Sequence, residues 1–383
     1  MVIELREFER VRLAQDKLSH TQAKRLQHAF AAQVTVRWLF DTQQWELIAQ
    51  GWAGAINLDG LELHLKPKIP LQNLFHLLEI ANNLPIRHLP NLVHSQTVDD
   101  FYARLAARLT QLISRRLKQG LYQAYETRTA RLPYVRGRLD VAQIRAGHIT
   151  LPVRFDEISA DNPHNQLLLT ALSQLLRTNL LSNEKRTVAR QAYRQLRRVI
   201  TLQAFDPRQR LTYTRLNADY EQMHTLCRFF LTHMMPLHET GSAETLPFLV
   251  NMAALFEQFV AQWLTDNLPD AYQLHIQERS SLADGKIQIA IDLVIVERAT
   301  GLVKMVLDTK WKSAEKPAND DIYQIAFYAN TRHSPQAILI YPAPLKHPLD
   351  ETIRDVRLRT LVFDVTDSID NAGKKFMIDL LKN

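Results

Sequence analysis

Residues 287–311 read IQIAIDLVIVERATGLVKMVLDTKW. The first part of this stretch, 287–297, is almost entirely apolar, as a strand covered on both faces of a sheet should be. Asp292 nevertheless lies in its middle. A buried carboxylate is unfavourable unless a positive group meets it. The stretch therefore predicts an interior strand that carries a functional acid.

A hairpin is predicted to follow this strand. The Ala-Thr-Gly sequence at 299–301 is typical of a turn, so the next apolar run should fold back and bring Asp308 toward Asp292. Because side chains alternate along a strand, Asp308 and Lys310 should share one face while Thr309 points away. The hairpin thus predicts two acids and one lysine on one side of the sheet.

These groups fit metal-dependent hydrolysis of a phosphodiester. Two carboxylates that converge in an apolar sheet repel each other unless a divalent cation lies between them, and magnesium prefers oxygen ligands. We expect Asp292, Asp308 and the backbone carbonyl of Thr309 to hold Mg²⁺ or Mn²⁺. Lys310 would orient the attacking water or offset charge that develops on the phosphate. The alternative is that Asp308 and Lys310 form a plain ion pair on one face.

The last third of the chain alternates helical and strand patterns. They predict a helix over about 247–267, strands at 272–277, 287–297 and 303–311, a helix over 320–331 and a strand at 337–341. This order predicts a mixed sheet flanked by helices, in a domain that we place at 241–383.

Two other regions are predicted before this domain. Residues 1–97 form a small mixed α+β domain, with strands at 34–40, 45–50, 53–58 and 61–65, a turn at Asp59-Gly60 and a helix over 71–84. Residues 98–240 are mostly helical, with helices at 98–118, 165–181, 184–200 and 217–234, a helix start at Asp161-Asn162-Pro163, and turn-rich pieces between 121 and 158. Residues 236–247 are the linker candidate. The fold class is a multidomain protein of mixed α/β type.

An acid in one strand and an acid-x-lysine triplet in the next resemble the PD-(D/E)xK nuclease superfamily. Asp292 corresponds to the first acid, and Asp308, Thr309 and Lys310 correspond to the triplet. The usual proline before the first acid is absent, since Ile291 precedes Asp292. The resemblance implies a nuclease core made of a mixed sheet with helices on its flanks.

The same resemblance assigns supporting roles to two helices. Glu257 occupies the place of a helix acid that supports the metal site in many members, and its alternative is an exposed residue beside two core phenylalanines. Gln324 and Tyr328 lie four residues apart and resemble a glutamine-x-x-x-tyrosine feature. A polar helix face packed on the sheet is the alternative for this pair.

Over nearly the whole chain, the order of features resembles the McrC family, the nuclease subunit of methylcytosine-dependent restriction systems. The matching stretches are 54–58, 63–69 (LHLKPKI), 136–139 (RGRL), 161–165 (DNPHN), 255–259 (LFEQF) and the strand pair that carries the acids. The resemblance implies an N-terminal domain that docks on a hexameric AAA+ GTPase and a C-terminal domain that cuts DNA. The ten glycines of this chain never form a G-x-x-x-x-G-K-[ST] loop, so any nucleotide-driven motor must be another chain.

Positive charge is concentrated in the middle of the chain. Residues 101–215 contain 21 Lys and Arg against 7 Asp and Glu, a net +14, whereas the whole chain has a net +7. Clustered arginines suit a phosphate backbone, because each neutralised phosphate releases condensed counterions. The arginines that we expect to contact DNA are Arg136, Arg138, Arg194, Arg197 and Arg198. A solvated helical face is the alternative.

Composition excludes several other classes of protein. The chain has 383 residues, of which 46% are hydrophobic, and this is typical of globular domains rather than disorder. Its single cysteine excludes internal disulfides and thiolate metal sites. No apolar run approaches the length of a membrane span, so we expect a cytoplasmic protein without membrane contacts.

Three functions remain open at this point. The first is a magnesium-dependent DNA endonuclease subunit of a GTP-dependent restriction complex that acts on modified cytosine and stimulates its AAA+ partner. The second is a non-catalytic adaptor that binds DNA and a GTPase on a nuclease fold. The third is a stand-alone nuclease, such as a junction resolvase or a repair enzyme.

Overall fold

The computed structural model describes residues 1–383 except 59, 85–96, 145–148, 203–204, 208, 234–247, 283–286, 313, 367 and 383. Contacts divide the chain into two compact units, one of Met1–Phe101 with Leu237–Asn383 and one of Tyr102–Pro236. The first unit combines most of the predicted N-terminal and C-terminal regions. The boundaries at 97 and 240 stay predictions, and the predicted linker at 236–247 and Asp59 lie outside the described residues.

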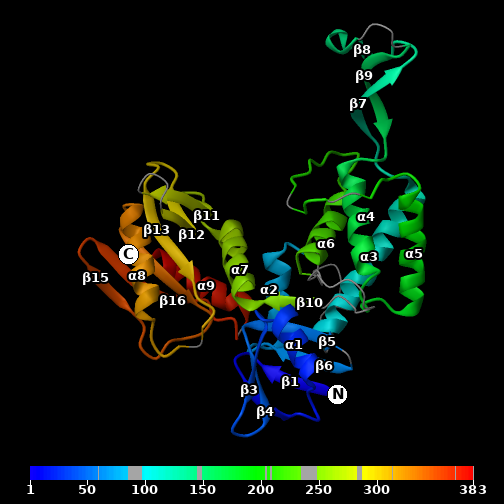
Figure 1. The fold of residues 1–383 in the computed structure, drawn as a ribbon. Helices are drawn as coiled ribbons and strands as arrows, with labels where there is room; N and C mark the ends of the chain where they lie inside the picture. The colour runs from blue at the N-terminus through cyan, green and yellow to red at the C-terminus, as the bar shows by residue number, and fades with distance from the viewer. Residues whose placement is uncertain are drawn as a thin grey trace. The chain divides into compact units, whose positions relative to one another are not determined.

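Two small sheets contain the N-terminal strands of the first unit (Figure 1). One has the order β1-β6-β5-β10, from Val2–Arg6, Leu61–Lys66, Trp52–Leu58 and Phe248–Asn251, and the other has the order β2-β4-β3, from Arg10–Ala14, Gln44–Ala49 and Val34–Leu39. The same part of the unit contains two helices, α1 (His20–Ala29), which packs against β3, and α2 (Leu71–Ala81), which packs against α7 (Met252–Asn267). Leu61, Leu63 and Leu65 are buried at alternating positions of β6, which confirms the predicted hairpin with β5.

Strand β10 corrects one prediction. The sequence predicted a helix from about Pro247, whereas Phe248–Asn251 pairs antiparallel with β5 and the helix α7 begins only at Met252. Asn251 ends the strand and caps the helix, because its side chain accepts a hydrogen bond from the backbone N–H of Ala254. A segment from the C-terminal half thus completes the N-terminal sheet.

The C-terminal part of the first unit contains a six-stranded mixed sheet. Its order is β11-β12-β13-β14-β16-β15, from Tyr272–Leu282, Ile287–Glu297, Val303–Thr309, Gln336–Tyr341, Val356–Val362 and Asp350–Ile353. Helices α7 (Met252–Asn267), α8 (Asn319–Thr331) and α9 (Ile369–Leu381) pack on it (Figure 1). The predicted order of helix, three strands, helix and strand is confirmed, while β15, β16 and α9 had no counterpart in the prediction.

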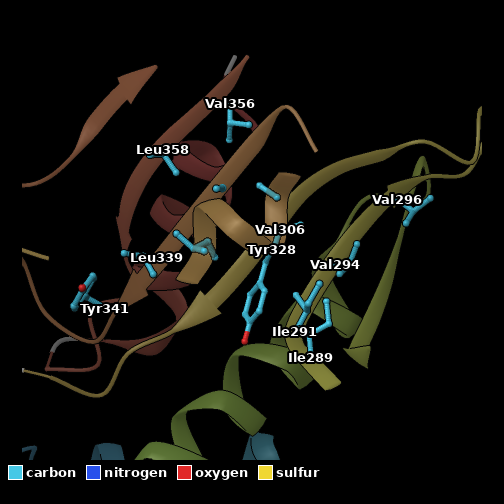
Figure 2. Packing of buried hydrophobic residues seen from close by; sticks show 13 residues of the cluster. Ile289, Ile291, Val294, Val296, Val306, Tyr328, Leu339, Tyr341, Val356 and Leu358 are labelled. Atoms are coloured by element: carbon cyan, nitrogen blue, oxygen red, sulfur yellow. The ribbon is translucent and has the colours of Figure 1, made fainter. Parts of the chain in front are cut away.

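Alternation along β14 shows how the sheet is covered. Ala337, Leu339 and Tyr341 belong to a cluster with Tyr328 of α8, and Figure 2 shows Tyr328 beside Ile291 of β12. The intervening Ile338 and Ile340 are also fully buried. Both faces of the sheet are therefore covered at its centre, as the apolar sequence of β12 predicted.

The second unit is built of helices and one three-stranded sheet. The helices are α3 (Val98–Gln119), which begins just before this unit, α4 (Pro163–Leu175), α5 (Asn183–Arg197) and α6 (Tyr220–His233), and the strands are β7 (Ala124–Leu132), β8 (Arg138–Leu139) and β9 (Leu151–Ser159). Asn162 caps α4 and Pro163 occupies its first turn, as predicted. The turn-rich pieces predicted between 121 and 158 instead form a long antiparallel ladder of β7 and β9.

Gly137 is required where the short strand β8 meets β9. Its φ is +70°, and a Cβ there would lie 2.4 Å from the carbonyl oxygen of Arg154. Only glycine fits this close approach in the left-handed region. The backbone conformation therefore explains the glycine in the Arg-Gly-Arg sequence at 136–138.

In the described part of the chain, no helix has the length and apolar character needed to cross a membrane.

Arg359 is a buried cation that ties β16 to the end of α9. Its guanidinium donates to the carbonyl oxygens of Asp379 (3.2 Å), Leu380 (3.2 Å) and Lys382 (3.1 Å), and to Gln336 (2.8 Å). These carbonyls belong to the last turn of a helix, which has no donors of its own for them.

We expect Arg359→Met to lower the free energy of unfolding by about 1–3 kcal/mol, because the carbonyls lose their donors. Urea denaturation followed by circular dichroism measures it. Arg357→Met is the control, since Arg357 lies on the same strand and pairs with Asp350 at the surface. Equal losses in the two variants would contradict the prediction.

Candidate functional site

The register of β12 and β13 brings the two predicted acids together. The strands run antiparallel with Leu293 opposite Leu307, so the next residues outward are Asp292 and Asp308. At that point the Asp292 carboxylate accepts a hydrogen bond from the backbone N–H of Thr309 (3.1 Å). The hydroxyl of Thr309 lies 3.4 Å from the same oxygen, so both the backbone and the side chain of Thr309 lie beside Asp292. The side chain of Asp292 on β12 is therefore hydrogen-bonded to the last residue of β13.

Lys310 lies at the centre of an ionic network. Its Nζ is 2.6 Å from Oδ2 of Asp308 and 3.6 Å from Oδ1 of Asp321. Asp308 is 3% exposed, so this contact is largely shielded from water. Asp321, on α8, also accepts from Lys312 (2.9 Å). The sequence did not single out Asp321 or Lys312, although Asp321 lies one helical turn before Gln324.

Helix α8 supports the lysine from its other side. The Gln324 side chain accepts a hydrogen bond from Lys310 Nζ (3.1 Å) and donates one to the Tyr328 hydroxyl (2.9 Å). Tyr328 is buried within the sheet cluster. The predicted glutamine and tyrosine therefore form one chain of hydrogen bonds that ends on the lysine.

Glu257 lies near the acids but bonds elsewhere. Its carboxylate accepts a hydrogen bond from the side chain of Gln277 (3.1 Å). Gln277 has a φ of +48° and lies where Asp292 would be its partner in the ladder between β11 and β12, with Ile276–Leu293 and Glu278–Ile291 paired on either side. Burial raises the pKa of Glu257, and the charge of Asp292 raises it further. No sequence pattern singled out Gln277.

Burial and like charge dominate the electrostatics at Asp308. Burial, followed by the charge of Asp292, raises the pKa of Asp308 to about 6, although the hydrogen bond and the charge of Lys310 act in the opposite direction. Burial lowers the pKa of Lys310, but its pairing with Asp308 more than offsets this and the net shift is upward. Lys310 is thus an ammonium at neutral pH. It can stabilise negative charge or orient a water, but it cannot accept a proton there.

Trp311 connects the motif to two other parts of the same unit. Its indole N–H donates to Glu7 (2.7 Å), a carboxylate that is 3% exposed and also accepts from the backbone N–H of Lys68. The indole ring packs against Phe256, the neighbour of Glu257. The residue after the catalytic candidate Lys310 therefore touches both the N-terminal segment and α7.

The donors at this site suit a hard divalent cation. Asp292, Asp308 and Glu257 offer carboxylate oxygens. The pKa of Asp308 is raised by burial and then by the charge of Asp292, and a cation would stabilise the charged carboxylates against both effects. Within the described ranges, no three His, Cys, Asp or Glu side chains are arranged as a metal-binding group. Magnesium is commonly held by only one or two carboxylates, with water and substrate phosphate as its other ligands. The pair of aspartates fits such an ion, whereas a role for Glu257 as a direct ligand stays a prediction.

The arginines predicted to contact DNA lie in different surroundings. Arg136 stacks over the Phe155 ring at 4.0 Å and pairs with Glu157 at 3.4 Å. Arg138 lies on β8 and is exposed. Arg194 and Arg198 line one hollow on the surface of α5. The remaining one, Arg197, donates to the carbonyl oxygen of Ile200 (3.4 Å).

The raised pKa of Asp308 makes stability depend on pH. Because the folded protein holds this proton more tightly than a carboxyl of ordinary pKa 3.8, the stability that it contributes is present at low pH and is lost as the pH rises toward and through about 6. In metal-free buffer, we expect Asp308→Asn to stabilise the protein by roughly 2–3 kcal/mol more at pH 8 than at pH 4. Urea denaturation at both pH values measures this, with the exposed Asp355→Asn as control. A difference that does not change with pH would contradict the assignment.

Comparisons with known proteins agree with this architecture. A family model described as "McrBC 5-methylcytosine restriction system component" matches residues 47–342. A solved half-complex of Thermococcus gammatolerans McrB AAA+ hexamers with bound McrC contains a chain that is 18% identical over 99% of both chains, with a TM-score of 0.57. A chain of the McrBC complex from the same organism is 18% identical over 70% of this chain and 89% of that one, with a TM-score of 0.43. No curated protein matches the sequence. Because the family model spans most of the chain and the predicted resemblance agrees with it, this protein belongs to the McrBC family of restriction system components.

Proposed function

We propose that this chain is the DNA-cleaving subunit of its restriction system, with its active site at Asp292, Asp308 and Lys310. The observation that carries the proposal is the convergence of two acids and an ammonium on neighbouring strands, with Lys310 Nζ 2.6 Å from Asp308. Membership in the McrBC family makes DNA the expected substrate. A similar solved chain belongs to a complex of McrB AAA+ hexamers with bound McrC. We propose that this chain also binds an AAA+ hexamer, and that this partner is a GTPase, as the resemblance to the McrC family implies.

The residues divide the chemistry among them. Mg²⁺, held by Asp292, Asp308 and the carbonyl of Thr309, would supply a Lewis acid for the phosphate and lower the pKa of an attacking water. The Lys310 ammonium stabilises the negative charge that develops on the phosphate. Gln324 holds Lys310 in place through its hydrogen bond, and Tyr328 holds Gln324. Glu257, restrained by Gln277, supports the acidic side of the site.

An adaptor without catalysis is the competing function. In an adaptor, Asp308 would serve only as the partner of Lys310. The raised pKa of Asp308 argues against this role, because the pair leaves the carboxylate less stable in its charged form than in water. Strain of this kind at a charged cluster is typical of functional sites.

We expect Asp308→Ala to reduce DNA cleavage by about a hundredfold or more, because the variant loses a metal-binding carboxylate beside the phosphate. The assay uses 5-methylcytosine DNA and unmethylated DNA, each with and without the AAA+ partner, GTP and Mg²⁺. Asp355→Ala, in an exposed turn, is the matched control. Assembly with the partner and stimulation of its GTPase should be unchanged in both variants.

Three outcomes separate the functions. Equal cleavage by the parent and by Asp308→Ala would rule out this active site. If the parent stimulates the GTPase but never cuts, the protein is an adaptor. Cleavage by the parent alone, without GTP or partner, would identify a stand-alone nuclease.

Metal binding can be tested without measuring cleavage. Titration with Mg²⁺ at pH 8 should raise the melting temperature of the parent, since a ligand at a hundredfold excess over its Kd stabilises the folded state by about 2.7 kcal/mol. We expect Asp308→Asn to lose this shift and Asp355→Asn to keep it. A parent protein that does not respond to Mg²⁺ or Mn²⁺ would contradict the metal site.

A further inference from the structure

One face of α5 forms a basic stripe. A hollow of about 570 Å³ is lined by five of its side chains and by the residue that caps its C-terminus, Arg198; the five are Thr187, Arg190, Gln191, Arg194 and Gln195. They recur every three or four residues and therefore lie along one side of the helix. All six are exposed, whereas Ala189, Ala192 and Leu196 are buried. The helix thus packs through its apolar side and presents the basic stripe to solvent.

The stripe consists of hydrogen-bond donors and lacks acids. Arg190, Arg194 and Arg198 are four residues apart and extend over about 12 Å of helix. Among the described residues, none of these three guanidinium groups has an ion-pair partner. Other arginines of this unit are paired, as Arg116 is with Asp219 and Arg128 with Glu157. The stripe therefore carries uncompensated positive charge in a regular row.

Two other arginines of α5 have structural contacts instead. Arg186 donates to the carbonyl oxygens of Leu176 (3.2 Å) and Thr178, which ties α5 to the end of α4. Arg197 donates to Ile200 O (3.4 Å) at the end of its own helix and does not line the hollow. The structure thus favours Arg190 over Arg197 as the companion of Arg194 and Arg198.

We propose that this stripe binds the phosphate backbone of duplex DNA without reading its sequence. Arginine, threonine and glutamine are side chains that commonly contact phosphate oxygens, and the row of charges would follow one strand of a duplex. A protein partner is a poorer fit, because the stripe has no aromatic or aliphatic side chain to form the dry centre of such an interface. The choice of DNA as the polyanion rests on the proposed nuclease function.

The test measures equilibrium binding of the full-length chain to a fluorescent duplex in EDTA, by anisotropy over a range of salt concentrations. We expect R190Q/R194Q/R198Q to bind about tenfold or more weakly at 50 mM salt, with the slope of log K against log salt reduced by about two to three. The lysine triple at the same positions should retain most of the binding. The matched control is R177Q/R210Q/R215Q, which removes equal charge from exposed positions in the same unit and should bind like the parent.

Single variants test the choice of residues, since R190Q should weaken binding more than R197Q. Equal binding by the stripe variant and the parent, or equal losses in the stripe and control triples, would overturn the proposal. Loss of assembly with the AAA+ partner while DNA binding stays normal would also overturn it and would make the stripe a protein contact. Because binding is measured in EDTA, these results are independent of whether the chain cleaves DNA.

Discussion

The pairing of β12 with β13 is the constraint on which the site depends. Antiparallel register places Asp292 across from Asp308 at the end of the paired region, where two carboxylates would repel each other in a poorly solvated place. Lys310 compensates part of this charge but leaves the pKa of Asp308 raised. The protein therefore maintains an arrangement that opposes its own stability. Such an arrangement is understandable where a cation and a phosphate complete the set of charges.

The surrounding elements hold this arrangement through hydrogen bonds to Lys310 and to Glu257. On one side, Tyr328 and Gln324 of α8 fix the ammonium of Lys310 through successive hydrogen bonds. On the other, Gln277 restrains Glu257. Trp311 joins the end of the motif to the buried carboxylate of Glu7. These partners lie far apart in sequence, so the geometry of the site reports on the packing of the whole first unit.

Much of the core could be predicted because its signals are local. The apolar run around Asp292, the Ala-Thr-Gly turn and the alternation of Asp308 and Lys310 are encoded within one hairpin, and the structure has these strands in the predicted pairing. Gln277 and Glu7 could not be found in this way, since their roles arise from a left-handed backbone and from a contact across 304 positions. The metal, the DNA contacts and the cleavage reaction stay predictions, because they depend on ligands. The strand β10 was missed because its few apolar residues continue directly into the apolar pattern of α7.

The pairing of β10 with β5 makes the second unit an insertion within the first. The chain leaves the first unit near Phe101 and returns near Leu237, and only then supplies the strand that completes the N-terminal sheet. During synthesis on the ribosome, β5 therefore emerges long before its neighbour and presents an open edge. The inserted unit can fold in that interval, whereas the N-terminal sheet cannot be completed until β10 has been synthesised. A chain released early would keep its basic helices but would have neither a finished N-terminal sheet nor an acidic site.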